Sequence, residues 1–309
     1  MIRRNKCDVM RATGTLATVF LSAASAMAPN HDRFLPQMRK LRVGGVPEHF
    51  SLPVKLAQDK GLISCEFVAQ PGGTGEMIHN LTSPAGSATH IDVAIALTEG
   101  LVLATQRGDL RGCGIVSVFV ESPLQWGIHT GPSSTAQCVT DLDPRTCRIA
   151  ISRHMSGSHL MSWVFAKAHG WPVEQLQFVV VGGLTGALKA FEEGRVDLFL
   201  WDRFMTAPVV ADGSLRLLGS IDSPWPCFCV AASEEVIEKR GEELHAFLEA
   251  VSREGRHLKD NADDMVALLA KLHRLSEPIA REWLAATVYA QPHPLPDNIV
   301  KQICEFIPH

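Results

Sequence analysis

Short apolar runs alternate along most of the chain with longer stretches whose apolar positions recur every three or four residues. The short runs predict buried strands, and the spaced stretches predict amphipathic helices. The expected strands are LRVGGV, CEFVA, IDVAIAL, RGCGIVSVFVE, LQWGIHTG, RIAIS, QFVVV, VDLFLW and FCVAAS. Helices are expected in LPVKLAQDKGLI, which Gly61 would end, and over residues 74–81, 157–170, 184–193, 234–259, 261–275, 277–289 and 296–306. This alternation predicts a mostly parallel α/β fold.

Three of the expected strands lead into a turn of glycine, serine or threonine that opens a helix. The turns are PGGTGEM at 71–77, LTEG at 97–100 and SRHMSGSH at 152–159. Such turns place backbone N–H groups and the positive end of a helix dipole at the carboxyl edge of the sheet, where open α/β sheets collect ligands. The first two turns precede a loop-like break at 131–136, and the third follows it. We therefore expect two lobes that face each other across a cleft.

The first turn has the glycines of a ligand-binding loop without the signature of a nucleotide site. Gly72, Gly73 and Gly75 permit positive φ angles and a close approach of the backbone to a ligand. The turn lacks the lysine of a Walker loop and the spacing of G-x-G-x-x-G, so nucleotide binding is poorly supported. Thr74 can cap the helix or offer a hydroxyl to a ligand, and both readings stay open.

The third turn brings serines and histidines together. Ser158 and His159 are neighbours in sequence, so on a helix they point about 100° apart and cannot form a nucleophile–base pair. No G-x-S-x-G motif is present, and no acid is apparent nearby to orient His154. Ser156 and Ser158 therefore read as helix-capping or ligand-binding hydroxyls, and no catalytic residue is assigned.

Composition and charge narrow the class of protein. Of 309 residues, 46% are hydrophobic and 20% charged, which is typical of a soluble globular protein. The net charge of −4 gives no basic footprint, so nucleic acid is not an expected partner. After residue 30 no apolar run approaches the twenty residues of a membrane span.

The first 30 residues have the composition of a targeting segment. A basic start, MIRRNKCDVMR, precedes a mildly apolar run that ends in A-x-A motifs. A secretory signal and a mitochondrial presequence both fit, and a disordered tail is the alternative. Seven cysteines follow the segment, an odd number of thiols among apolar neighbours, which favours a mitochondrial or cytosolic location over a secreted or periplasmic one.

Three further pairs of residues stand at the ends of expected strands. Cys227 and Cys229 would share one strand face, but no second Cys/His pair has zinc spacing, so buried thiols are favoured and no metal site is expected. Glu48-His49 and Trp201-Asp202 follow strands and would point into the cleft, with a structural histidine and a surface turn as the alternatives.

Seven segments in a fixed order carry a resemblance to a known family. They are VPEHFSLP, PGGTGEMI, IDVAIALTEG, VESPLQWGIHTG, SRHMSGSHLM, FLWDRF and SPWPCF, and they span about residues 41–235. The chain resembles the type-2 periplasmic-binding-protein-like family. Within it, the chain is similar to a stand-alone fungal and bacterial subgroup. That subgroup is related to the ABC nitrate, sulfonate and taurine substrate-binding proteins and to thiamine-pyrimidine-synthase-like proteins.

This resemblance implies an α/β fold of two lobes joined by two crossover hinge strands. The first lobe would comprise residues 41–128 and 226–309, and the second residues 129–225, with GIHTG and SPWPC as the crossovers. Closure of the lobes would bury a ligand that helix N-termini grip and aromatic rings cap. The candidate ligand-binding residues are Pro47, Glu48, His49, Gly73, Thr74, Gly75, Thr98, Glu99, Ser122, Trp126, Ser152, Ser156, Gly157, Ser158, Trp201, Asp202 and Trp225.

The expected function is capture of a small anionic or heteroaromatic molecule without catalysis and without a cofactor. An ABC permease is a possible partner of such a protein, and the oligomeric state stays open. The alternative is an enzyme like thiamine pyrimidine synthase that uses pyridoxal phosphate, for which His49 or His159 and Lys55 or Lys60 would be the reactive residues. Against the family pattern, His154-Met155 stands where a smaller pair with glycine is expected, and FMTAP at 204–208 lacks a Thr-Lys.

Overall fold

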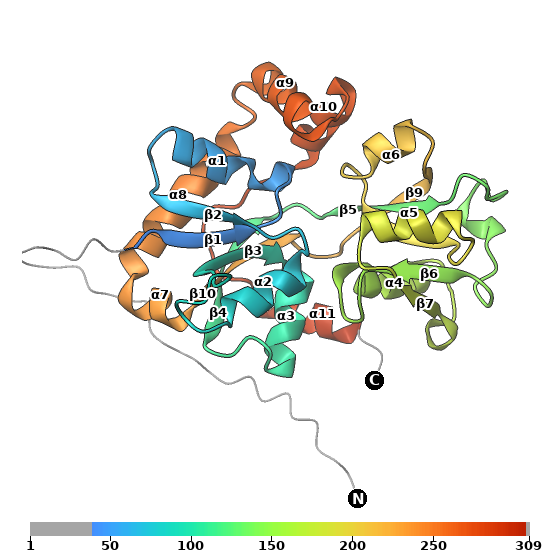
Figure 1. The fold of residues 1–309 in the computed structure, drawn as a ribbon, viewed down its shortest axis with the longest axis horizontal. Helices are drawn as coiled ribbons and strands as arrows, with labels where there is room; N and C mark the ends of the chain where they lie inside the picture. The colour runs from blue at the N-terminus through green and yellow to red at the C-terminus, as the bar shows by residue number, and fades with distance from the viewer. Residues whose placement is uncertain (1–38, 307–309) are drawn as a thin grey trace, which may run out of the picture. The chain divides into compact units, whose positions relative to one another are not determined.

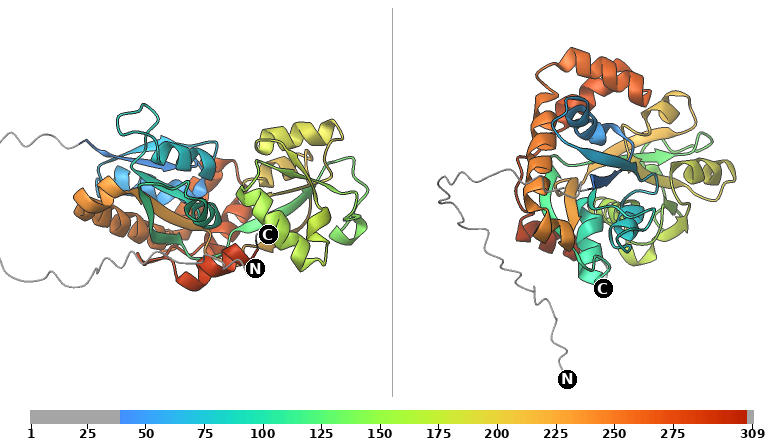
Figure 2. Two further views of the ribbon diagram at one scale, coloured as in Figure 1. Left: turned by 90° about the horizontal axis from the view of Figure 1, so that it is seen from below. Right: turned by 60° about the vertical axis from the view of Figure 1, so that its left-hand side comes forward.

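The computed structural model describes residues 39–306, and the predicted targeting segment lies outside this range. Two five-stranded β-sheets, each flanked by helices, account for most of the described residues (Figure 1). The first sheet lies among the blue, teal and orange elements, and the second lies among the green and yellow ones. Figure 2 shows the same two groups from further directions. None of the described helices is long and apolar enough to cross a membrane.

The first sheet has the strand order β2-β1-β3-β10-β4. β1 pairs in parallel with β2 and β3, whereas β10 is antiparallel to both β3 and β4. The strands are β1 Leu41–Gly45, β2 Cys65–Ala69, β3 Val93–Leu97, β4 Cys113–Val120 and β10 Phe228–Ser233. The helices that follow these strands are α1 Leu52–Asp59, α2 Thr74–Leu81, α3 Thr98–Arg107, α7 Glu234–Lys239 and α8 Gly241–His257.

The second sheet has the order β7-β6-β8-β5-β9. β6 is parallel to β7 and β8, and β5 is antiparallel to β8 and β9. The strands are β5 Gln125–Thr130, β6 Arg148–Ile151, β7 Gln177–Val180, β8 Leu198–Asp202 and β9 Arg216–Asp222. The helices of this part are α4 Gly157–Ala168, α5 Leu184–Glu192 and α6 Ala207–Ala211. The chain ends in α9 Ala262–His273, α10 Glu277–Ala286 and α11 Asp297–Glu305.

The expected α/β class is confirmed, but the expectation of mostly parallel sheets is wrong. Four strand pairs are parallel and four are antiparallel. The reason is that β5 and β10 arrive directly from the other sheet without a crossover helix, and each runs against its neighbours. The single helix expected over 234–259 is also two helices, because Arg240 leaves the helical region between α7 and α8.

Alternation along the central strands divides the first sheet into two apolar faces. Val93 and Ile95 of β3 join one buried cluster, while Ala94 and Ala96 join another beneath α2 and α3. The period of two is the one expected when successive side chains of a strand point to opposite faces. Alanines on the second face leave room for the two helices that open at the carboxyl end of the sheet.

Two short segments connect the sheets, residues 121–124 on the outward path and 223–227 on the return. They hydrogen-bond to each other: Ser223 N donates to Leu124 O at 3.0 Å, and Cys227 N donates to Ser122 O at 3.2 Å. The SPWPC crossover predicted from sequence coincides with the return segment. The outward prediction, GIHTG, is wrong, because Gly127–Thr130 lies within β5 and pairs with β8 and β9.

Candidate functional site

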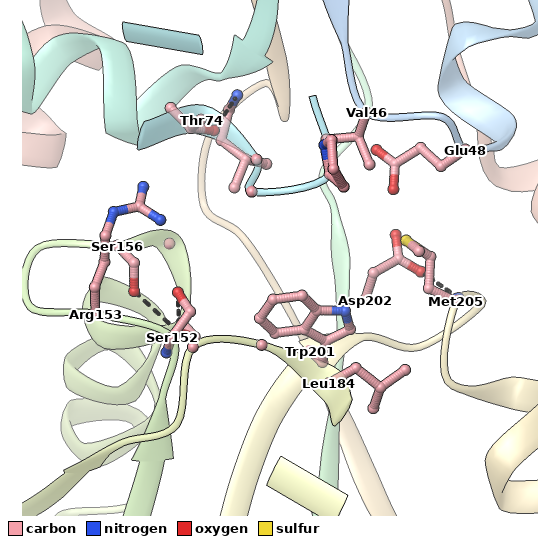
Figure 3. A pocket seen from close by; sticks show the side chains of 18 of the residues that line it. Val46, Glu48, Thr74, Ser152, Arg153, Ser156, Leu184, Trp201, Asp202 and Met205 are labelled. Carbon is pink, nitrogen blue, oxygen red and sulfur yellow. Dashed lines mark hydrogen bonds between the residues drawn. The ribbon is translucent and has the colours of Figure 1, made fainter. Parts of the chain in front are cut away.

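A cavity of about 540 Å³ opens between the carboxyl ends of the strands of both sheets. Residues that follow β1 and β2 line one side, and residues that follow β6, β7 and β8 line the other (Figure 3). The first turns of α2, α4 and α5 all reach it. The cavity is therefore surrounded by three helix N-termini, whose first N–H groups have no acceptor within their own helix.

The turn before α2 depends on a glycine conformation. Gly73 has a φ of 69°, in the left-handed region that favours glycine. This geometry lets the chain reverse directly after Gly72 and start the helix at Thr74. Thr74 Oγ1 accepts a hydrogen bond of 3.2 Å from Leu97 N, which fixes the turn to the end of β3. The sequence pattern PGGT thus positions the start of α2 against the cavity.

A buried serine cluster holds the start of α4. Ser156 is the N-cap, and its Oγ accepts from His159 N at 3.3 Å. Ser158 Oγ accepts from Ser152 N at 2.9 Å and lies 3.0 Å from Ser156 Oγ. The hydroxyls thus hydrogen-bond to one another and to the backbone of the turn, and the serines still line the cavity (Figure 3).

The histidines of this turn do not act on the serines. His159 Nδ1 accepts a hydrogen bond of 2.9 Å from Met155 N, and its ring packs 4.2 Å from that of Trp163. Burial lowers the pKa of His159 to about 4, so it is neutral at physiological pH. Met155 has a φ of 61°, a backbone conformation that favours glycine. It belongs to the His154-Met155 pair, where the family resemblance leads us to expect a smaller pair that includes glycine.

The start of α5 contributes the third turn. Gly182 has a φ of 82°, and Gly183 serves as an N-cap without a side-chain hydrogen bond. A Cβ on Gly186 would lie 1.8 Å from the Val181 carbonyl oxygen, so only glycine fits this close approach. The sequence analysis did not select this turn, although VVVGGLTG shows the same signal of a strand running into glycines.

Arg153 supplies a positive charge beside the helix N-termini. Its guanidinium packs over α2, because a Cβ on Gly75 would lie 2.4 Å from its Cζ. It makes no ion pair with any residue that the structure describes, and burial together with the Arg107 charge lowers its pKa. A half-buried cation without a carboxylate, next to helix dipoles of the same sign, favours an anion in the cavity.

Two carboxyl groups converge at another part of the cavity wall, near Met205 (Figure 3). Asp202 Oδ1 accepts from Phe204 N at 2.7 Å and from Met205 N at 2.9 Å, and Oδ2 lies 3.7 Å from His49 Nε2. Glu48 comes from the first sheet. Burial raises the pKa of Glu48 to about 7. The neighbouring His49 lowers this pKa in part, and the negative charge of Asp202 raises it further.

Trp201 forms an aromatic wall between the serine cluster and the carboxyl groups (Figure 3). Its ring stacks on Phe199 at 5.1 Å with an interplanar angle of 21°. Trp126 lines the cavity as well, and its buried Nε1 has no hydrogen-bond partner among the described residues. Planar and apolar parts of a ligand would be accommodated here.

The structure brings many of the candidate residues together and leaves others behind the cavity wall. Those that line the cavity are Glu48, Gly73, Thr74, Trp126, Ser152, Ser156, Gly157, Ser158, Trp201 and Asp202. Those that do not line it are Pro47, His49, Gly75, Thr98, Glu99, Ser122 and Trp225.

Several of the second group have structural partners instead. Thr98 Oγ1 lies 3.3 Å from Cys229 Sγ, and Ser122 Oγ accepts from Val288 N at 3.0 Å. Glu99 and Trp225 bond to each other within the core. Position in a turn, at a strand end or in a crossover was their signal, and it does not separate the side chains that face the cavity from those packed behind it.

Sequence reasoning missed more than half of the lining. The lining residues outside the list of candidate ligand-binding residues are Val46, Pro71, Gly72, Met77, Leu97, Leu124, Arg153, Val181, Gly182, Gly183, Leu184, Thr185, Gly186, Met205 and Phe228, of which the sequence analysis considered only Gly72. Most are apolar or glycine and carry no chemical signature in the sequence. Arg153 lies inside the SRHMSGSH turn, but a single arginine in a polar turn is not by itself a sequence signal for a binding site.

The residues nominated for a pyridoxal phosphate enzyme do not fit that group in this cavity. No lysine is among the described residues that line it, and Lys60 instead pairs with Glu254 at 2.6 Å. His49 and His159 are buried outside the lining. Cys227 and Cys229 are buried thiols, as predicted. Within residues 39–306, no group of three or more His, Cys, Asp or Glu side chains is placed to hold a metal ion.

Two sheets joined by paired crossovers, with helix N-termini around a shared cavity, define a protein with the generic periplasmic-binding-protein fold. A family model described as Ca3427-like PBP matches residues 126–221, which span most of the second sheet. These findings confirm the resemblance to the type-2 periplasmic-binding-protein-like family and the fold that it implies. A comparison with curated protein sequences finds no significant match.

Solved structures extend the similarity to most of the chain. The chain is similar to the Candida albicans CA3427 gene product, which defines a family with the generic periplasmic binding protein fold. The identity is 26% and the TM-score 0.73, over 82% of this chain and 83% of that one. The chain is also similar to the alkanesulfonate-binding protein SsuA of Xanthomonas axonopodis pv. citri, bound to MOPS. The identity is 20% and the TM-score 0.70, over 85% of this chain and 89% of that one. For the periplasmic nitrate-binding protein NrtA of Synechocystis PCC 6803, the identity is 16% and the TM-score 0.65, over 80% of this chain and 70% of that one.

Proposed function

We propose that the protein binds a small molecule with an anionic group in this cavity and releases it chemically unchanged. The observation that carries the proposal is Arg153, a half-buried guanidinium without an ion-pair partner among the described residues, beside the first turn of α2. The first turns of α4 and α5 line the same cavity. An anion at this place would accept charge-assisted hydrogen bonds from the Arg153 guanidinium.

The rest of the lining favours binding over chemistry. The serines that a nucleophilic mechanism would need are hydrogen-bonded to one another, and His159 faces Met155 N rather than a serine. Trp201 and Trp126 offer apolar surface to the remainder of the ligand. A few polar groups that fix orientation within a mostly apolar lining are typical of small-molecule sites.

The comparisons support an anionic ligand by analogy. One similar protein is named for alkanesulfonates and another for nitrate, and both names refer to small anions. The two crossover segments, which bond to each other between the sheets, are the place where a hinge closure would occur. Closure would bring the α2 turn of the first sheet onto the α4 and α5 turns of the second.

The test is a binding measurement on the protein freed of any co-purified ligand by unfolding and refolding. Thermal unfolding is recorded with nitrate, sulfate, ethanesulfonate, benzenesulfonate and phenyl phosphate. We expect at least one organic anion to raise the midpoint of unfolding in a concentration-dependent way, as binding to the native state requires. No rise with any of these anions, in refolded protein with native circular dichroism, would contradict the proposal.

A substitution separates the cavity from the general protein surface. Arg153→Gln should strongly reduce the stabilisation by the anions that bind. Arg145→Gln, which changes an exposed arginine that pairs with Asp143, should leave it intact. Incubation of the anion with the protein and analysis by mass spectrometry should return the anion unaltered.

A further inference from the structure

Glu48 is a buried carboxyl group that points into the cavity without a partner. Its residue is only 9% exposed, yet its side chain makes no hydrogen bond to any residue that the structure describes. Figure 3 shows it directed from the first sheet toward Asp202 and Met205. Because Glu48 lines the cavity and has no such partner, its carboxyl group is open to a polar group of a ligand there.

Asp202 makes the same part of the cavity more negative. Its carboxylate is held in place by hydrogen bonds from the backbone N–H groups of Phe204 and Met205. It comes from the second sheet, whereas Glu48 follows a strand of the first, and the two carboxyl groups converge near Met205. The His49 Nε2 atom lies 3.7 Å from Asp202 Oδ2. One imidazole cannot neutralise two carboxyl groups once Glu48 has given up its proton.

The cavity therefore has two poles with the Trp201 ring between them (Figure 3). Arg153 and the helix turns around it form the positive pole, and Glu48 with Asp202 forms the negative pole. No described ion pair joins the poles, so neither neutralises the other. A ligand with an anionic group alone would satisfy only the first of them.

We propose that the ligand is a dipolar ion, with an oxyanion at Arg153 and a protonated nitrogen between Glu48 and Asp202. This inference rests on the proposed function, because it takes the anion site for granted and adds a cation subsite. An ammonium group or protonated ring nitrogen would donate to Glu48 and hold it ionised. The positive charge of this nitrogen would offset the repulsion between the two carboxylates, which converge on the same part of the cavity.

Three probes of matched size separate the two poles. Para-aminomethylbenzenesulfonate carries both charges, para-ethylbenzenesulfonate only the anion, and para-tert-butylbenzylamine only the cation. Affinities are measured at pH 8 by isothermal titration calorimetry on refolded protein. We expect the dipolar probe to bind about tenfold tighter than the anionic probe, the factor that corresponds to one added favourable charge contact.

Glu48→Gln tests where the preference arises. In this variant the dipolar and anionic probes should bind within about twofold of each other, because the neutral amide no longer attracts the ammonium group. Its affinity for para-ethylbenzenesulfonate should be equal to or higher than that of the unmodified protein, which shows that the cavity is intact. Glu174→Gln, which alters an exposed carboxylate outside the cavity, should keep the full preference.

The outcomes distinguish this inference from the proposed function. Equal binding of the dipolar and anionic probes, or a preference that survives Glu48→Gln, overturns the cation subsite and leaves the anion site standing. Binding of the amine with no binding of either sulfonate overturns the proposed function and supports the cation subsite. Binding of none of the three probes overturns both.

Discussion

Trp225 Nε1 donates a hydrogen bond of 2.9 Å to Oε2 of Glu99, and both side chains are buried. Trp225 lies in the return crossover, and Glu99 lies in the first turn of α3, so the bond ties the crossover to the first sheet. The other carboxyl oxygen, Oε1, has no hydrogen-bond partner among the described residues. Burial outweighs the hydrogen bonds from its own backbone and from Trp225, and it raises the pKa of Glu99 to about 7.

This raised pKa predicts that stability falls as the pH rises. The folded protein keeps the Glu99 proton up to about pH 7, whereas the unfolded chain releases it near the ordinary value of 4.5. The stabilisation is therefore fully present below pH 4.5 and is lost as the pH rises to 7. Each pKa unit is worth about 1.4 kcal/mol, so Glu99 alone accounts for about 3 kcal/mol. Urea unfolding at pH 5 and pH 8 measures the change.

Glu99→Gln should remove this part of the pH dependence, because the amide has no charge to bury. We expect its free energy of unfolding to fall by about 2.5 kcal/mol less between the two pH values than that of the unmodified protein, because part of the effect is already lost at pH 5. Glu174→Gln, at an exposed position, is the control and should follow the unmodified protein. Equal pH slopes for Glu99→Gln and the unmodified protein would show that Glu99 is ionised in the folded state.

Gly157 provides a second prediction, about the packing of α4 against the first sheet. A Cβ at this position would lie 2.7 Å from Leu97 Cδ1 and 2.9 Å from Glu99 Oε1. Both contacts come from the first sheet, whereas Gly157 begins a helix of the second. Gly157→Ala should therefore destabilise the protein by about 1–3 kcal/mol, the usual cost of an overpacked site.

The matched control for this substitution is Gly219→Ala. Gly219 lies in β9, and the nearest atom to an added Cβ is Ile128 Cδ1 at 3.9 Å. Its effect on the free energy of unfolding should stay within about 0.5 kcal/mol, as for ordinary surface changes. The predicted packing is wrong if both alanine variants unfold at the same urea concentration.

The parts of the fold that the sequence predicted best are those with local causes. The helix expected over 74–81 begins and ends where predicted, because Gly73 supplies the positive φ before Thr74 and the apolar spacing continues to Leu81. The outward crossover was misplaced because an apolar run such as QWGIHT is a strand in either role. Only pairing with β8 and β9, which depends on distant residues, assigns it to the second sheet.

The candidate site was predicted in part for the same reason. The PGGT and SGS turns reach the cavity because strand-to-helix turns gather at one sheet edge, and this follows from local sequence. The absence of a partner for Arg153 and Glu48 among the described residues does not follow from local sequence. Whether a charged side chain has a partner depends on which residues from the rest of the chain come near it, and an unpaired arginine looks like any other in sequence.

Arg153→Gln is expected to weaken anion binding without weakening the fold. The guanidinium is half-buried, and burial and Arg107 disfavour its charge in the free protein. Loss of a charge-assisted contact costs about 1.5–3 kcal/mol of binding free energy, which is roughly a tenfold to hundredfold loss of affinity for para-ethylbenzenesulfonate. The free energy of unfolding without ligand should stay equal or rise. An unchanged affinity would place the anion elsewhere.

Trp201 allows the aromatic wall to be separated from the anion site. The ring stacks on Phe199 and stands between the serine cluster and the carboxyl groups. Trp201→Ala should weaken binding of para-ethylbenzenesulfonate about tenfold, because a ligand ring loses a stacking contact of about 1 kcal/mol and the apolar area around it. Trp201→Phe keeps a stacking ring and should retain most of the affinity. Ethanesulfonate, which has no ring, should bind the alanine variant within about twofold of its normal affinity. Equal losses for both sulfonates would mean that Trp201 shapes the anion pole itself rather than contacting the ring.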